Sequence, residues 1–150
     1  MTRKKKNDFK INRKSYNKIQ RAYGISVHRA LGNGLGRRTF AGTDGTCDEK
    51  HSLFRISVFD GGKIVGMARM LGDLGLDYFI KDVVVRPEYQ KMGIGRLLID
   101  ELLNFVRKNG VSGTNIFVEL CAEPGKIPFY EKFGFDYDES QRLKLMCKAD

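Results

Sequence analysis

Residues 85–96 of the chain have the sequence VRPEYQKMGIGR, and they join an apolar segment to an amphipathic one. The apolar residues that follow recur at the spacing of a helix face: Ile94, Leu97, Leu98, Leu102, Phe105 and Val106. The polar residues between them also repeat at helical spacing, which indicates a wet face: Asp100, Glu101, Asn104, Arg107 and Lys108. This pattern predicts a helix over residues 94–108 that Asn109-Gly110 ends in a left-handed C-terminal cap.

The loop ahead of this predicted helix is suited to bind an anion. The first N–H groups of a helix lack partners within it, and the helix dipole favours negative charge at that end. Gly93 and Gly95 keep side chains away from the backbone, and Lys91 and Arg96 add positive charge, a combination that suits a pyrophosphate. The glycines alone are equally typical of a tight strand-to-helix turn. Neither a Gly-x-Gly-x-x-Gly nor a Gly-Lys-Ser/Thr pattern is present.

Outward from this loop, the sequence predicts a sheet. Three apolar runs, over residues 53–59, 63–71 and 78–85, are separated by glycine-containing turns and favour an antiparallel meander. A strand over 115–120 follows the predicted helix, so it pairs in parallel with the third strand through a crossover. A short helix from Pro128 to Gly134 and a last strand over 143–148 complete the pattern. The predicted fold class is α+β with a mixed, mostly antiparallel sheet.

The first fifty residues follow a different pattern. The basic composition of residues 1–11 predicts a flexible arm, and residues 12–150 are expected to form a single domain. Residues 12–23 favour a helix that Gly24 ends, and residues 31–46 are rich in Gly, Asn, Thr and Asp, which is typical of a long loop.

Composition narrows the function classes. The 150 residues carry a net charge of +9, which favours polyanions, yet no helix-turn-helix, zinc-finger or RNA-binding signature is present. With three cysteines, none in a Cys-x-x-Cys pair, and two histidines, we expect neither a disulfide framework nor a metal site. Cys121 is expected to be a small buried hydrophobe. No apolar run could span a membrane and no signal core follows the N-terminus, so we expect a cytoplasmic protein.

Two motifs resemble those of the GCN5-related N-acetyltransferase (GNAT) superfamily. Residues 85–95 are similar to its acetyl-CoA motif, whose core is Gln/Arg-x-x-Gly-x-Gly/Ala. Residues 128–135, PFYEKFGF, resemble its later Tyr-x-x-x-Gly-Phe motif. The resemblance covers residues 52–137 and implies a GNAT-like three-layer α/β/α domain, whereas the N-terminal third matches only in its helix-then-loop plan.

The resemblance implies that acetyl-CoA, the co-substrate, lies where the third predicted strand and the next one splay apart. Backbone groups of Val83, Val84 and Val85 would hold the pantetheine arm and the acetyl carbonyl, since an extended ligand can add to an open strand edge. Main-chain N–H groups would hold the pyrophosphate, from these residues: Gln90, Lys91, Met92, Gly93, Ile94, Gly95 and Arg96. No metal is expected. The family's Asn ahead of the late helix is missing here, where Lys126 is either a phosphate ligand or a solvated side chain.

Tyr130 aligns with the tyrosine that serves as general acid in many family members; the alternative is a core aromatic with its hydroxyl paired at a rim. Candidates for the base are Asp82, Glu119 and Glu123. Asp82 interrupts an apolar run, where it is either a base or a structural hydrogen-bond or salt-bridge partner. Strand alternation turns it away from Phe79 and Lys81 unless a bulge intervenes. Relatives with a catalytic His or Glu often carry it at one of those two positions, and this chain does not. A water relay, or an amine that arrives neutral, is also consistent with that gap.

The predicted function is N-acetyl transfer from acetyl-CoA to a small primary amine by direct attack in a ternary complex. A protein acetyltransferase acting on lysine or an N-terminus, and a non-catalytic acyl-CoA-binding regulator, remain alternatives. The expected partners are acetyl-CoA and an amine acceptor, with no membrane and no specific nucleic acid. A homodimer is compatible with the sequence, which does not determine the oligomeric state.

Overall fold

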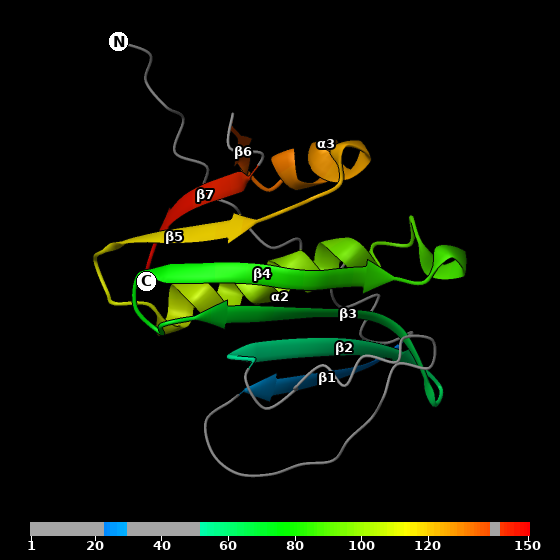
Figure 1. Ribbon diagram of the computed structural model, residues 1–150. Coiled ribbons are helices and arrows are strands. Elements are labelled where there is room, and N and C mark those ends of the chain that lie inside the picture. Colours follow the sequence, from blue (N-terminus) through cyan, green and yellow to red (C-terminus); the bar gives the residue numbers. More distant parts are fainter. Residues whose placement is uncertain (1–22, 30–51, 139–141) are drawn as a thin grey trace.

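The computed structural model of the chain describes residues 23–29, 52–138 and 142–150 (Figure 1). The expected arm, all of the N-terminal helix except Tyr23, and the 31–46 loop lie outside these ranges. The elements are β1 (Gly24–Arg29), β2 (Phe54–Asp60), β3 (Lys63–Gly72), β4 (Asp77–Val85), η2 (Pro87–Tyr89), α2 (Ile94–Asn109), β5 (Asn115–Leu120), η3 (Pro124–Lys126), α3 (Ile127–Glu131), β6 (Asp136–Tyr137) and β7 (Leu143–Lys148).

The described strands form one seven-stranded sheet in the order β1-β2-β3-β4-β5-β7-β6. Every neighbouring pair is antiparallel except β4 and β5, which pair in parallel across the α2 crossover. The predicted α+β class and mixed, mostly antiparallel sheet are therefore confirmed. Strand β1 was not predicted: Gly24, expected to end a helix, is its first residue.

The turn between β3 and β4 is fixed by one carboxylate. Oδ1 of Asp73 accepts the backbone N–H groups of Gly75, Leu76 and Asp77 at 2.7, 3.0 and 3.1 Å. These hydrogen bonds hold the pKa of Asp73 below its ordinary value, and the bond from Gly75 has the largest effect. The predicted glycine-containing turn is thus stabilised by an Asx-type arrangement that the sequence pattern did not specify.

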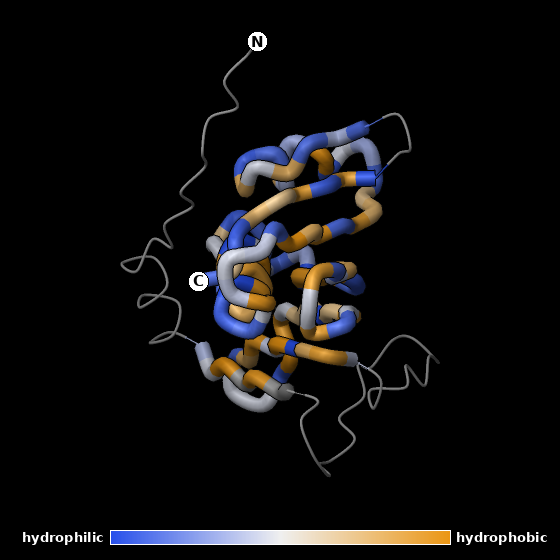
Figure 2. Tube along the Cα trace, turned by 90° about the vertical axis from the view of Figure 1, so that its left-hand side faces the viewer, coloured by the Kyte–Doolittle hydropathy of each residue, from blue (hydrophilic) through white to orange (hydrophobic). Residues whose placement is uncertain are grey.

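Helix α2 covers one face of the sheet, across β2, β3 and β4 (Figure 1). Gly66 of β3 allows the close approach, because a Cβ at that position would lie 2.7 Å from Cγ2 of Ile94. Figure 2 shows hydrophobic and hydrophilic residues interspersed along the described chain, and burial alternates along β5, as in a strand whose every second side chain enters the core. Among the described residues, no helix is long and apolar enough to cross a membrane.

Two details of α2 differ from the prediction. Asp100, assigned to the wet face, is only 5% exposed, because Ile99 and Leu103 beside it are also buried and the helix is covered on more than one side. Gly110 ends the helix in an extended conformation, with φ of −71°, rather than in a left-handed cap. Its N–H bonds to the carbonyl of Val106 at 2.9 Å, which satisfies that carbonyl without a left-handed residue.

Candidate active site

Strands β4 and β5 separate halfway along β4. They pair only at Asp77↔Phe117, Tyr78↔Val118 and Phe79↔Glu119. Beyond these pairs β4 continues toward η2 while β5 leads to α3, and Figure 1 shows the two strands diverging. Within the described residues, the second half of β4 therefore has β3 on one side and no strand on the other, which leaves an open edge inside the sheet.

A β-bulge interrupts β4 where the strands diverge. Lys81 pairs with Arg69 and Val84 pairs with Met67, so Asp82 and Val83 together stand opposite Ala68. Asp82 has a φ of +52°, which a bulged residue can adopt. The predicted alternation is thereby broken, and the Asp82 carboxylate accepts a hydrogen bond from Nε of Arg69, the residue paired with Lys81.

The bulge also re-aims the end of β4. Ile80 pairs with Met70 and is 3% exposed, on the face that α2 covers. Val85 lies on the same face, since its Cγ2 is 3.8 Å from a Cβ placed on Gly95 of α2. In a regular strand Ile80 and Val85 would point to opposite faces, because they are an odd number of residues apart. The extra residue of the bulge accounts for their pointing to the same face.

The divergence leaves a cleft of about 310 Å³ beside the bulge. It brings together the predicted acid Tyr130 and two of the three predicted bases, Asp82 and Glu123. The lining residues are Ile80, Asp82, Val83, Leu120, Cys121, Ala122, Glu123, Lys126 and Tyr130. The prediction that Cys121 is buried is wrong: it follows the last residue of β5, where the chain leaves the sheet, and its thiol is exposed.

Tyr130 enters the cleft from α3. Its side chain is 8% exposed, and its ring makes edge contacts with Phe129 and Phe135 at centroid distances of 5.1 and 6.2 Å. No hydrogen bond joins its hydroxyl to another described residue. Burial raises the pKa of Tyr130 above its ordinary value, so the phenol is neutral and keeps its proton at pH 7.

The three carboxylates proposed as bases have different surroundings. Asp82 pairs with Arg69, whose Nη1 also donates to Oγ of the buried Ser52 at 3.3 Å. Glu119 pairs with Arg142 at 3.4 Å and does not line the cleft, so the structure does not bring it to Tyr130. Glu123 is exposed at the cleft.

The loop before α2 keeps its main chain available. Gly93 precedes the helix with a φ of 90°, Lys91 has a φ of 61°, and no side chain caps the helix N-terminus. The first helical hydrogen bond runs from the N–H of Leu97 to the carbonyl of Gly93 at 3.0 Å. Gly95 has a second reason to be glycine, because a Cβ there would lie 3.3 Å from Cζ of Phe129 in α3. The helix start thus reaches α3.

The residues predicted to bind the cofactor lie along the open edge of β4, in the loop before α2 and at the start of that helix. Val83 and Val85 are half-buried and Val84 is 43% exposed, at the open edge of β4. The side chain of Ile94 belongs to the core, so only its backbone could meet a ligand. Gln90, Lys91, Met92 and Arg96 are exposed, and Gly93 and Gly95 are partly exposed.

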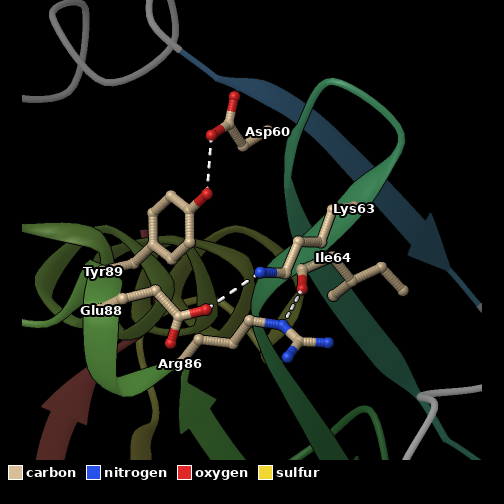
Figure 3. Close-up of polar contacts among 6 residues, drawn as sticks. All are labelled: Asp60, Lys63, Ile64, Arg86, Glu88 and Tyr89. Atoms are coloured by element: carbon tan, nitrogen blue, oxygen red, sulfur yellow. Dashed lines mark hydrogen bonds and ion pairs between the residues drawn. The ribbon is translucent and has the colours of Figure 1, made fainter.

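The segment between β4 and α2 is attached to the β2–β3 hairpin (Figure 3). Nε of Arg86 donates to the carbonyl of Ile64 at 2.7 Å. Glu88 pairs with Lys63 at 2.9 Å, and the Tyr89 hydroxyl donates to Oδ2 of Asp60 at 2.7 Å. These partners, like Arg69, lie in strands far along the chain from the residues they hold, so no local pattern could have revealed them.

The model of the acetyltransferase (GNAT) family matches residues 34–135. The chain belongs to this family. Serotonin N-acetyltransferase 2, chloroplastic, from Oryza sativa subsp. japonica is 38% identical to it over 77 residues, which are 51% of this chain and 36% of the rice protein. The chain spans about half or less of the length of the relatives it matches.

Two solved structures share this GNAT fold. SA2161 from Staphylococcus aureus, described as a probable acetyltransferase, has a TM-score of 0.54 and 30% identity over 59% of this chain and 65% of its own. YhbS from Escherichia coli, solved in complex with CoA, has a TM-score of 0.52 over 66% of this chain and 61% of its own. At 18% identity, YhbS supports the fold alone.

Proposed function

We propose that this GNAT-family chain is an N-acetyltransferase that moves an acetyl group from acetyl-CoA to a primary amine by direct attack in a ternary complex. The proposal depends most on one observation: Tyr130, a neutral tyrosine, lines the cleft where β4 separates from β5. The fold family and the uncapped start of α2 support the same assignment.

The residues present fit acetyl-CoA as co-substrate. The open edge of β4 offers main-chain groups of Val83, Val84 and Val85 to the amides of a pantetheine arm, much as a strand adds to a sheet. The main chain of residues 90–96 would hold the diphosphate at the α2 N-terminus, where the helix dipole favours negative charge. The family model that matches residues 34–135 is that of an acetyltransferase family, which supports this choice of ligand.

The chain's own groups would then assist attack on the thioester. The amine nitrogen bonds to the acetyl carbon, the carbon–sulfur bond breaks, and the Tyr130 hydroxyl donates its proton to the departing sulfur. A positioned acid contributes a factor of ~10²–10⁴ to such a step. We assign Asp82 to accept the amine proton, directly or through water, with Glu123 as the other carboxylate of the cleft.

We propose a small primary amine as the acceptor. The name of the rice relative specifies serotonin, an arylalkylamine, and this supports the class without fixing the compound. The alternative acceptor is a protein lysine or N-terminus.

The test measures CoA thiol release from acetyl-CoA with a panel of amines: an arylalkylamine, a polyamine, an amino sugar and a lysine peptide. We expect one class to support turnover and Tyr130→Phe to lower kcat by roughly 10²-fold. Tyr137→Phe is the matched control, because Tyr137 is 46% exposed and lies outside the cleft. Turnover that survives Tyr130→Phe unchanged would remove the assigned acid, and CoA binding with no turnover on any amine would favour the regulator.

A further inference from the structure

The tip of the β2–β3 hairpin makes two polar contacts with the segment that leads into α2. Asp60 ends β2 and accepts the hydroxyl of Tyr89 at 2.7 Å, and Lys63 begins β3 and pairs with Glu88 at 2.9 Å. The Lys63 ammonium also lies 5.6 Å from the centre of the Tyr89 ring. Figure 3 shows these side chains meeting from the two elements.

A third contact comes from the residue before β1. The ring of Tyr23 packs edge-on against Tyr89 at 6.2 Å, and its hydroxyl donates to Sδ of Met92 at 3.6 Å. Because Gly24 pairs with Phe59, Tyr23 lies beside the end of β2, so Tyr89 contacts two adjacent segments: the residue ahead of β1 and Asp60 of β2.

The backbone just after Tyr89 needs such support. Lys91 has a φ of 61° and Gly93 a φ of 90°, so the chain passes through the left-handed region twice within three residues. A non-glycine residue keeps this conformation only where its surroundings fix it. Upstream, Arg86 is held to β3 by its N–H and its Nε at 2.9 and 2.7 Å, and Gln90 is held by its Nε2 to the carbonyl of Val85 at 3.1 Å. Between these two points, Glu88 and Tyr89 supply the side-chain contacts.

We propose that Asp60 and Lys63 are positioning residues for the diphosphate loop over residues 90–96, acting through Tyr89 and Glu88. The inference rests on the proposed function, which assigns that loop to CoA. Both hairpin contacts are at the surface, with side-chain exposures of 49% for Lys63 and 53% for Glu88. Exposed pairs contribute little to global stability, so their loss should affect the loop more than the fold.

The experiment compares Asp60→Asn, Tyr89→Phe and Lys63→Met with wild type in two readouts. The first is amide hydrogen exchange of residues 90–96 in the free protein, which requires no assumption about the ligand. The second is the Kd of CoA by calorimetry. We expect faster exchange at 90–96 with unchanged exchange in the centre of α2, and a Kd raised about fivefold, as the loss of an exposed charged contact allows.

Matched controls separate positioning from general destabilisation. Lys144→Met breaks the similarly exposed Lys144–Asp138 pair of 2.6 Å, and Tyr137→Phe removes an exposed hydroxyl elsewhere. Both should leave loop exchange and CoA affinity at wild-type values. Lys63→Arg keeps the ion pair with Glu88 and should restore them, and the effects of Asp60→Asn and Tyr89→Phe should not add when combined.

Unchanged exchange at 90–96 in all three variants would overturn the proposal. Equally faster exchange and equally weaker CoA binding in the control variants would also overturn it. If wild type itself does not bind CoA, the proposed function fails, and the exchange data still decide whether the hairpin positions the loop.

Discussion

Tyr130 and Asp82 line the same cleft from different elements, and their side chains are held in different ways. Tyr130 is fixed by the aromatic rings of α3 and the following turn, and its hydroxyl bonds to no other described residue. Asp82 is held by Arg69 at a bulge whose backbone it also shapes. Because the Tyr130 hydroxyl bonds to no residue of the described ranges, it is suited to donate its proton, whereas the paired carboxylate of Asp82 requires its own test.

Asp82→Asn should lower kcat by roughly 10²-fold if this carboxylate accepts the amine proton, because the amide cannot serve as a base. The substitution keeps the size of the side chain, so the bulge can persist. The matched control is Glu119→Gln, which also removes a carboxylate paired with an arginine, 3.4 Å away, but outside the cleft. Steady-state kinetics of the two variants on the same amine decide the point. Equal rates in Asp82→Asn and wild type would leave Glu123 or water to take the proton.

At the scale of elements, periodicity predicted what depends on local pattern. The strands of the meander, β5, β7 and α2 follow from the spacing of apolar residues, and their bounds agree within a residue or so. Strand β1 was missed because Gly24 at its start resembles a helix stop. Asp100 was misplaced because helical spacing describes one face, while the burial of α2 on further sides depends on the tertiary packing.

The candidate site was predictable where it depends on local sequence pattern, and not where it depends on tertiary packing. The loop and Tyr130 belong to contiguous motifs, so the sequence identified them. The bulge at Asp82, the exposed thiol of Cys121 and the contacts of Arg69 depend on how strands diverge and pair, which no local stretch records.

Burial raises the pKa of Asp100 from 3.8 to about 6, opposed by Arg96 at 3.7 Å. Glu101 raises this pKa further and Arg107 lowers it. A folded-state pKa above the unfolded value means that the protonated carboxyl favours folding. Its contribution is fully present below the unfolded pKa and is lost as pH rises through about 6. The shift corresponds to about 3 kcal/mol.

Asp100→Asn should therefore be more stable than wild type at pH 7.5, and the difference should shrink toward pH 4.5. Urea unfolding of both proteins at a series of pH values measures it. Asp136→Asn serves as the control, since Asp136 is exposed. A stability difference that is the same at every pH would show that the buried charge is not its source.

At the scale of the whole molecule, the cleft lies between two parts of the sheet. Strands β1 to β4 with α2 form one part, and β5 to β7 with α3 form the other (Figure 1). The parts are joined by the short β4–β5 ladder and by contacts such as that of the Arg96 guanidinium with the Phe133 ring, 5.7 Å from its centre. A ligand that lies along the cleft would touch both parts at once.

CoA binding should consequently stabilise the two parts together. At a CoA concentration about 100 times Kd, the free energy of unfolding should rise by about 2.7 kcal/mol. ADP carries only the diphosphate end, so at equal concentration it should stabilise less, because it cannot pair with the open edge of β4. Thermal unfolding with each ligand gives the comparison, and amide exchange locates the protection, expected at residues 83–85 as well as 90–96. Protection confined to 90–96, with equal stabilisation by ADP, would mean that the diphosphate alone is held and that the β4 edge is not the pantetheine site.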